Sequence, residues 1–413
     1  MRLHDHHFHP LGYAQMVTGL ELMDSANLEE VKERVAARAE VTTGAVIGQR
    51  LNDEGLAELR LPTRFDLDEA VPDRPVVLYR YCGHVAVANT AALTVAGISA
   101  GTPDPPGGSF DRDRTGFPTG VLRETALLVI GNAIAPLAEA PTDADVLSAL
   151  RGLLDYGLGS VTGMVSATDP IWCGVGDELE TLCRLAPDLP LDIDIYVITE
   201  TPVDLVAAAK RIREADGRLR FSGWKGFSDG SFGGHTAAMY EPFADRPDTT
   251  GTLRLYPGQA FAMSKVSLEI GGGVALHAIG DRANDVALDL FESLIDDGSD
   301  PSLLRVEHAS LLTDAAVERM ARLGVTASVQ PAFLASEASW LHKRLGEERM
   351  QRVYPFHTLQ EAGVHLLGGS DSPVELPDPQ VGIRAAVQRH GFDPGEALSL
   401  EQATALFAPP QQP

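Results

Sequence analysis

The chain has 413 residues, with 33 Lys or Arg against 58 Asp or Glu, which gives a formal net charge of −25. A surface this acidic repels phosphate groups, so we expect neither nucleic acid nor an anionic membrane as a partner. Hydrophobic residues make up 44% of the chain, which is ordinary for a globular protein and sufficient for a large core.

Three further features bear on the class of protein. No apolar run is long enough to cross a bilayer, and the first residues are polar and rich in histidine, unlike a signal peptide. The cysteines Cys82, Cys173 and Cys183 match neither a CxxC metal pair nor a disulfide framework, so we interpret them as buried or half-buried thiols. The sequence therefore predicts a cytoplasmic protein.

The N-terminal stretch Asp5-His6-His7-Phe8-His9 is the first candidate for chemistry. If residues 3–8 form a strand, alternate side chains share a face, which places Asp5, His7 and His9 together. Two imidazoles two residues apart on one face can reach a single metal ion. Alone the pattern is weak, because a His-rich N-terminus is more often a solvated end.

The region after this strand has two parts. A charged amphipathic helix is predicted from Asn27, its N-cap, to Glu40. From Val46 to Asp145 the pattern is irregular, with a strand at residues 75–81, a small-residue helix at 89–96 and a loop rich in Gly, Pro and Asp at 101–120. Apolar runs here are short, so we interpret residues 46–145 as an insertion without a core of its own that contributes to the substrate pocket.

From Asp145 onward, short apolar runs alternate with helical patterns. The runs lie at residues 160–165, 191–198, 221–227, 274–279, 304–308, 325–330 and 364–368, and the helices at 145–156, 177–185, 203–215, 258–270, 281–295, 314–323 and 358–362. With the N-terminal strand they make about eight β-then-α units. This count predicts an α/β fold, a (β/α)8 TIM-like barrel that spans residues 1–413 as one domain with a large insertion after its first strand. A doubly wound open sheet is the alternative, but no GxGxxG follows the first strand.

Polar side chains stand at the ends of several of these runs. They are His7 and His9, Lys225, His277, His308 and Asp371. In a parallel barrel the carboxyl ends of the strands meet at one rim, which carries the chemistry. Each residue alone has an ordinary explanation: an interior histidine, a surface lysine, or an aspartate in a turn. Together they predict one site.

These residues lie in longer motifs. They include Asp5-His6-His7-Phe8-His9, Gly83-His84, Lys225-Gly226-Phe227-Ser228-Asp229-Gly230, His277-Ala278-Ile279-Gly280-Asp281, Arg305-Val306-Glu307-His308-Ala309, Ser328-Val329-Gln330-Pro331 and Ser370-Asp371-Ser372-Pro373. On these motifs the chain resembles the amidohydrolase superfamily of metal-dependent hydrolases. It more closely resembles the YtcJ-like branch, which includes N-substituted formamide deformylases.

The resemblance implies a set of metal ligands. His7, His9 and Asp371 would bind one divalent metal, and His277 and His308 a second. Lys225 would bridge the two as N6-carboxylysine, because a neutral amine can add carbon dioxide and the carbamate is anionic and bidentate. Zinc is the default for imidazole and carboxylate ligands, although manganese, iron or cobalt would also fit.

The resemblance also implies a reaction. A metal-activated hydroxide would hydrolyse a C–N bond of a small amide, formamide or cyclic amide, with Asp371 moving the proton. His84 would contact the substrate carbonyl; capping of the following helix is the alternative. His235 stands where the family more often has a Ser-Arg-like pair, so we expect it to bear on substrate binding. By strand alternation we expect Trp224 and Glu307 to point outward, and we expect an Arg123–Glu124 ion pair inside the insertion.

Two alternatives to this hydrolase stay open. One is a mononuclear deaminase acting on a nitrogen heterocycle, and the other is a non-catalytic metal-binding barrel. Family members usually carry a small β-sandwich built from segments before strand one and after strand eight. Both flanks are missing or truncated in this sequence, so we expect an oligomer contact, in a homodimer, to cover the exposed end of the barrel.

Overall fold

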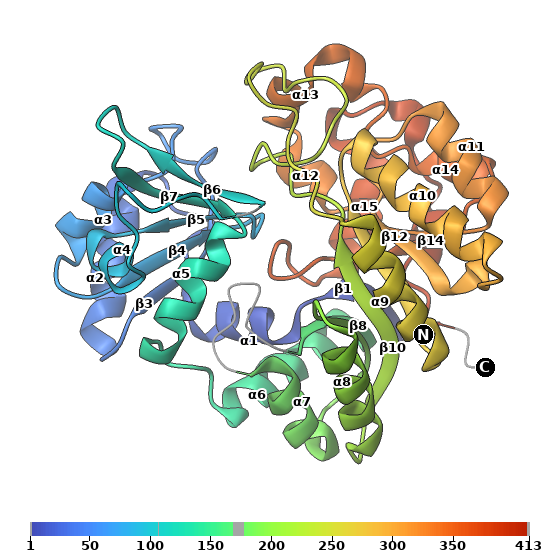
Figure 1. The fold of residues 1–413 in the computed structure, drawn as a ribbon, viewed down its shortest axis with the longest axis horizontal. Coiled ribbons are helices and arrows are strands. Elements are labelled where there is room, and N and C mark those ends of the chain that lie inside the picture. Colours follow the sequence, from blue (N-terminus) through green and yellow to red (C-terminus); the bar gives the residue numbers. More distant parts are fainter. Residues whose placement is uncertain (1, 106, 168–176, 411–413) are drawn as a thin grey trace. The chain divides into compact units, whose positions relative to one another are not determined.

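The computed structural model describes residues 2–105, 107–167 and 177–410, which fall into two units (Figure 1). The first unit comprises Met1–Pro10, Leu150–Thr168 and Leu179–Pro413, and the second comprises Leu11–Ala149 and Asp169–Glu178. Each unit has its own β-sheet. The second unit therefore begins at Leu11, well before the boundary at Val46 that we predicted for an insertion.

The first unit contains an eight-stranded parallel sheet. Its strands, in spatial order, are β1 (Leu3–Phe8), β8 (Leu158–Ser166), β9 (Asp192–Ile198), β10 (Leu219–Phe227), β11 (Gly273–Ala278), β12 (Leu304–His308), β13 (Thr326–Val329) and β14 (Leu366–Gly368). A parallel bridge between Phe8 and Ser372 brings the two edges of the sheet together. The predicted TIM-like barrel is confirmed in this nearly closed sheet, and the doubly wound alternative is wrong.

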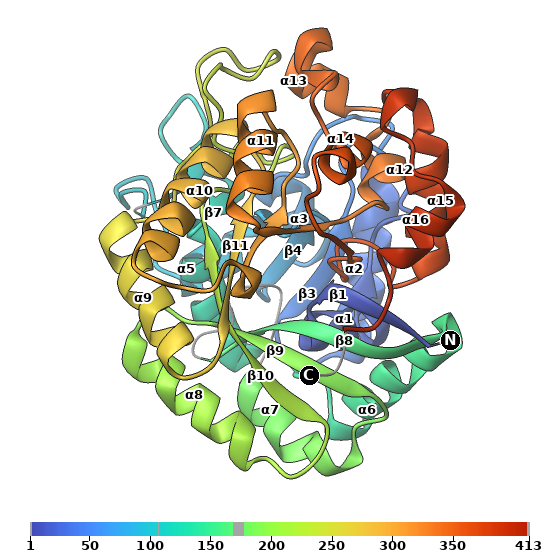
Figure 2. The same ribbon diagram turned by 90° about the vertical axis from the view of Figure 1, so that its right-hand side faces the viewer.

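Helices follow most of the strands of the first unit. They are α7 (Glu178–Leu185), α8 (Pro202–Glu214), α9 (Pro257–Glu269), α10 (Asp281–Asp296), α11 (Asp314–Leu323), α12 (Phe333–Glu337), α13 (Leu341–Met350), α14 (Phe356–Glu361), α15 (Pro379–Gln388) and α16 (Leu400–Ala405). Figure 2 shows α8 to α11 side by side around the outside of the sheet, where successive helices contact one another. The helix α6 (Asp143–Gly152) contains the point in the sequence, between Ala149 and Leu150, at which the chain passes from the second unit to the first.

Strand alternation explains how the barrel forms. In β9 the side chains of Ile193, Ile195 and Val197 are fully buried, whereas Asp194 and Tyr196 are half-buried and line a cavity. The apolar face thus packs under the helices and the polar face lines the barrel interior. The helix α10 supplies a matching stripe, since Ala287, Phe291 and the other apolar residues at helical spacing are buried.

The second unit is built on a six-stranded mixed sheet. Its strands, in spatial order, are β2 (Leu20–Glu21), β3 (Val46–Leu51), β4 (Val76–Arg80), β5 (Val85–Ala88), β7 (Pro118–Glu124) and β6 (Gly108–Arg112), and its helices are α1 (Pro10–Thr18), α2 (Leu28–Val41), α3 (Arg64–Ala70), α4 (Thr90–Val95) and α5 (Ala126–Ile134). The predicted helix at residues 27–40 is α2, and its N-cap Asn27 accepts a hydrogen bond from Glu30 N at 2.9 Å.

The second unit has a core on each face of its sheet. Val76 and Leu78 pack into a cluster with Val31 and Val35 of α2, whereas Val77 packs into a separate cluster with residues of α4 and α5. Our expectation that this region lacks a core is therefore wrong. Short strands buried on both faces provide the apolar surface that long runs would otherwise provide. Its contribution to a substrate pocket stays a prediction.

Two smaller expectations concern the whole described chain. No helix in the described residues is both long enough and apolar enough to span a membrane. Cys183 is buried and Cys82 is half-buried, as expected, and Cys173 lies outside the described residues.

Candidate metal centre

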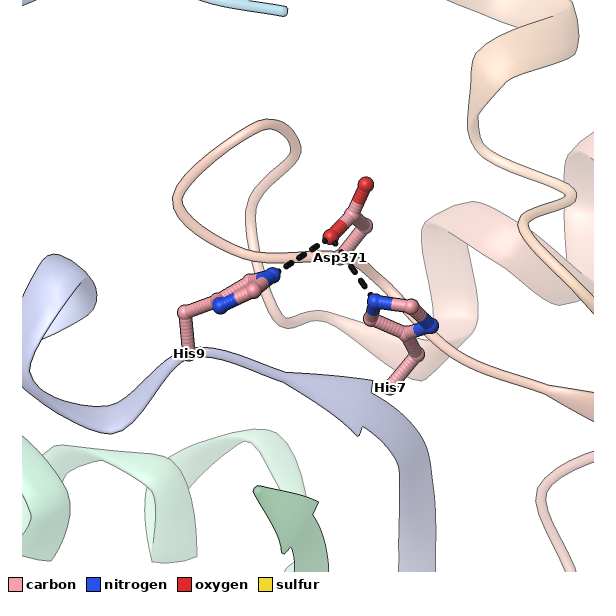
Figure 3. A group of neighbouring side chains, drawn as sticks. All are labelled: His7, His9 and Asp371. Atoms are coloured by element: carbon pink, nitrogen blue, oxygen red, sulfur yellow. Dashed lines mark hydrogen bonds and ion pairs between the residues drawn. The ribbon is translucent and has the colours of Figure 1, made fainter. Parts of the chain in front are cut away.

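Three predicted ligands meet at the carboxyl end of the barrel strands. His7 lies near the end of β1, His9 follows it, and Asp371 follows β14. One ligand atom of each lies within 4.8 Å of those of the other two. Figure 3 shows both imidazoles directed at one oxygen of Asp371: His9 Nε2 lies 3.1 Å and His7 Nε2 lies 3.2 Å from Asp371 Oδ1. All three residues are buried.

The backbone around β1 and β14 holds these three side chains in place. Asp371 N donates to His7 O at 2.7 Å, and His9 N donates to Ser372 O at 2.9 Å. A Cβ atom at Gly369 would lie 2.5 Å from His7 N, so only glycine permits this close approach. Asp5 is not a ligand here, because its Oδ1 accepts from His7 N and from Ser370 N, both at 3.0 Å.

The two other histidines lie beside this group. His277 is the last residue but one of β11, and His308 is the last residue of β12. Their ring centroids are 4.4 Å apart, and the His308 and His7 rings are 4.9 Å apart. The structure therefore brings all four predicted histidine ligands to one end of one barrel, as the rule on strand ends predicts.

Hydrogen-bond partners fix which nitrogen of three imidazoles carries the proton. His7 Nδ1 lies 2.6 Å from Glu307 Oε2, His308 Nδ1 lies 2.6 Å from Gln330 Oε1, and His277 Nε2 lies 2.9 Å from Gly230 O. Each of these oxygens can only accept, so the facing nitrogen donates. The opposite nitrogens of His308 and His277, Nε2 and Nδ1, then carry a lone pair. Burial by itself lowers the pKa of His7, but the Asp371 and Glu307 carboxylates raise it overall, so His7 Nε2 holds a proton toward Asp371 that a bound metal ion would replace. Such lone pairs, together with a carboxylate, fit a divalent metal ion.

Lys225 on β10 is buried among these groups, with only 2% of its surface exposed. Burial lowers the pKa of its amine to about 8, although the nearby carboxylates of Glu307 and Asp371 act in the opposite direction. Its Nζ lies 5.2 Å from the centroid of the Phe227 ring and makes no hydrogen bond or ion pair with another described residue. A substantial neutral fraction at mild alkaline pH follows.

The charges around His7, His9 and Asp371 favour the ionised form of the Asp371 carboxylate. Burial by itself raises the pKa of Asp371, but His7 and the hydrogen bonds from both imidazoles outweigh it and hold the pKa well below its usual range. The pKa of His308 is well below its usual range, mainly because of burial and the neighbouring His277. Asp371 is thus an anion and His308 a neutral imidazole, the forms that bind metal.

The outward orientation predicted for Glu307 is wrong. Glu307 is fully buried and contacts His7 across the barrel interior. Glu307 shares its strand face with Arg305, which lines the interior cavity, so alternation itself turns Glu307 inward. The residue that departs from alternation is His308, whose left-handed backbone, with φ of 72°, lets its ring also reach the site. Trp224 is buried as expected, and its Nε1 donates to Thr199 O at 3.0 Å.

His84 lies in the second unit, in the turn between β4 and β5. Its Nδ1 lies 2.9 Å from Glu124 Oε2, and both side chains are buried. Asn89 is the N-cap of α4, so the capping alternative for His84 is wrong. The predicted Arg123–Glu124 ion pair is also wrong, because Arg123 pairs with Asp111 at 2.7 Å. Substrate contact by His84 stays a prediction.

His235 lies in the loop after β10, and its Nε2 is 3.2 Å from Asp245 Oδ1. Asp245 also pairs with Arg344, and the Phe243 ring packs edge-on against the His235 ring with centroids 5.1 Å apart. This geometry holds the imidazole in place, and its role in substrate binding stays a prediction.

The sequence analysis did not identify two residues that hydrogen-bond the predicted metal ligands. Gln330 follows β13 and holds His308, and Glu307 holds His7. The rule on strand ends would have identified Gln330, because Gln330 is the last residue of the predicted apolar run 325–330. Glu307 would have followed from alternation, because it shares the polar face of β12 with Arg305, opposite Leu304 and Val306.

Comparison with known proteins agrees with this geometry. The model of the amidohydrolase family matches residues 3–409. YtcJ of Bacillus subtilis, which its name assigns provisionally to the amidohydrolases, is 31% identical over 98% of this chain and 77% of its own length. The N-substituted formamide deformylase of Arthrobacter pascens is 26% identical over 92% of this chain and 72% of its own length.

Two solved structures resemble the whole described fold. An uncharacterised metal-dependent hydrolase from Pyrococcus horikoshii OT3 has a TM-score of 0.75 and 31% identity, and covers 98% of this chain and 79% of its own. One from Pyrococcus furiosus has a TM-score of 0.72 and 34% identity, with 98% and 80% covered. This chain belongs to the amidohydrolase family of metal-dependent hydrolases.

Proposed function

We propose that this protein hydrolyses a carbon–nitrogen bond, other than a peptide bond, in a small amide, formamide or cyclic amide. One observation carries the proposal: ligand atoms of His7, His9 and Asp371 lie within 4.8 Å of one another at the strand ends, beside His277 and His308. The related N-substituted formamide deformylase supports the choice of substrate class.

The residues divide into two metal positions in this proposal. His7, His9 and Asp371 form the first position, and His277 and His308 form the second. Lys225, as N6-carboxylysine, would supply a further anionic ligand to the ions. Zinc is the ion that these imidazole and carboxylate donors favour. When bound, such an ion lowers the pKa of a water molecule toward neutrality and offers positive charge to a carbonyl oxygen.

Asp371 is the proton carrier in this proposal. Its Oδ1 faces both imidazoles, and its second oxygen points away from them (Figure 3). As an anion it accepts a proton from the attacking water and then donates it to the nitrogen that leaves. The C–N bond breaks as the new C–O bond is completed, and the products are a carboxylic acid and an amine.

Lys225 contributes through its neutral form. Because burial lowers the pKa of the amine to about 8, the nitrogen has a lone pair in part of the molecules near neutral pH. The lone pair adds to carbon dioxide, a nitrogen proton is lost to solvent, and an anionic carbamate results. That anion suits a position beside cations better than an ammonium does.

A mononuclear deaminase is the second candidate. It is favoured by the fact that, within the described part of the chain, the ligand atoms that lie within 4.8 Å of one another come from His7, His9 and Asp371, a set for one ion. Metal analysis separates the two candidates: one ion per chain favours the deaminase, and two favour the amide hydrolase.

The experiment is turnover by the purified full chain. Zinc-loaded protein is assayed against N-substituted formamides, cyclic amides and amino-substituted nitrogen heterocycles, with release of amine or ammonia as the readout. We expect hydrolysis of a formamide or cyclic amide, abolished in Asp371→Asn. Metal-loaded protein without turnover of any substrate would support the non-catalytic alternative. The homodimer and the cytoplasmic location also stay predictions, which mass photometry and cell fractionation check.

A further inference from the structure

The three imidazoles with fixed protons differ in the chemistry of their partners. His277 donates to a backbone carbonyl, that of Gly230, with the Asp229 carboxylate farther away at 3.4 Å from the same nitrogen, and His308 donates to the side-chain amide of Gln330. His7 donates to the carboxylate of Glu307 at 2.6 Å. An anionic acceptor increases the electron density at the opposite ring nitrogen more than a neutral one does. Because the carboxylate contact of His7 is the shorter one, 2.6 Å against 3.4 Å for His277, we rank the electron pair on His7 Nε2 as the strongest of the three toward a metal ion.

Arg305 on the same strand holds Glu307 in a fixed orientation. Arg305 Nη2 lies 3.0 Å from Glu307 Oε2, and its Nε also donates to Oε1. The same Nη2 donates to His6 O at 2.7 Å and to Ser328 Oγ at 3.0 Å. The guanidinium thus connects β12 to β1 and β13, and Glu307, which is fully buried, has no freedom to turn away from His7.

The contact between Glu307 and His7 crosses the interior of the barrel. Their strands, β12 and β1, are separated by β13 and β14 in the sheet. The ring of His7 is thus fixed on one side by Glu307, and its Nε2 is aimed at Asp371 Oδ1. The first metal position therefore combines a pre-oriented imidazole with an anionic ligand. At the second position the hydrogen-bond acceptors Gly230 O and Gln330 Oε1 are neutral, and the Asp229 carboxylate is more distant, with its Oδ1 3.4 Å from His277 Nε2.

We propose that Glu307, held by Arg305, is the positioning residue that makes the His7–His9–Asp371 position the tighter of two metal positions, so that the ions load in a fixed order. The inference rests on the proposed function, because it requires two ions. A purely structural ion pair would stabilise the fold without a separate effect on either metal affinity.

The test is a zinc titration of the metal-free full chain by chelator competition, repeated with cobalt to follow the absorption of the bound ion. We expect two steps in the wild type. Glu307→Gln, which keeps the shape and removes the charge, weakens the first step about 10- to 100-fold and leaves the second unchanged. His308→Ala removes the second step and leaves the first.

Glu396→Gln is the matched control. Glu396 is also a buried glutamate, and it accepts a hydrogen bond from Thr358 N at 3.0 Å. We expect it to leave both zinc steps and the cobalt spectrum unchanged, whereas Glu307→Gln alters the spectrum of the first cobalt ion.

Several outcomes overturn the proposal. They are equal affinities for the two ions in the wild type, an unweakened first step in Glu307→Gln, and loss of the tight step in His308→Ala. If Glu307→Gln does not fold, the zinc titrations of the wild type and of His308→Ala still decide the order in which the two ions bind. Protein that hydrolyses amides but loads its ions without order overturns this inference alone. Protein that binds no zinc overturns the proposed function as well.

Discussion

Lys225 gives a prediction that can be worked out from the structure of the metal-free protein. Its amine has a pKa of about 8 in the folded chain, mainly because of burial, against 10.5 for an ordinary lysine. This difference corresponds to about 3 kcal/mol by which the charged lysine disfavours folding. Lys225→Met keeps the length of the side chain and removes the charge, so it removes this cost.

The effect depends on pH in a definite direction. Below pH 8 the folded and unfolded chains both hold the proton, and the full cost of about 3 kcal/mol is present. Between pH 8 and 10.5 the unfolded chain holds more protons than the folded chain, so the free energy of unfolding of the wild type rises with pH. Lys225→Met should therefore be more stable than the wild type at pH 7, and its advantage should fall below about 1 kcal/mol at pH 10.

The assay is urea unfolding at both pH values, followed by circular dichroism, in buffers free of metal and carbon dioxide. Lys210 on α8, whose side chain is 73% exposed, supplies the control. Lys210→Met should stay within about 0.5 kcal/mol of the wild type at both pH values. The reasoning is refuted if Lys225→Met is less stable than the wild type at pH 7, or if its advantage is the same at pH 10.

Three more predictions follow from single contacts. Asp371→Asn should lower kcat/KM for a hydrolysed amide about 100-fold or more, because an amide cannot carry the proton; steady-state kinetics measures it. Asp53→Ala should cost about 3 kcal/mol in urea unfolding, because it removes the carboxylate 2.6 Å from Nε of the buried Arg80. Phe291→Ala should cost about 3–5 kcal/mol, because the ring on α10 is fully buried; a thermal midpoint unchanged from the wild type would contradict this.

The barrel and its ligands could be predicted from the sequence for one physical reason. Parallel strands bring their carboxyl ends to one rim, so a polar residue at the end of an apolar run is placed without knowledge of the packing. His7, His277, His308 and Asp371 all obey this rule, and the structure brings them together. Short apolar runs alternate with segments of helical periodicity, and this pattern was enough to predict the order of strands and helices from residue 158 onward.

The tertiary structure decided what depends on backbone turns and on residues far apart in sequence. His308 and Glu307 both face the interior because the backbone becomes left-handed at His308, and no periodicity in the sequence predicts such a turn. Glu124 pairs with His84, 40 residues away, instead of with its neighbour Arg123. The second unit has two cores because its short strands bury both faces, which only their pairing into one sheet reveals. Local sequence fixes the strand and its end, whereas the partner of a buried charge is chosen by whichever complementary group the whole fold brings within reach.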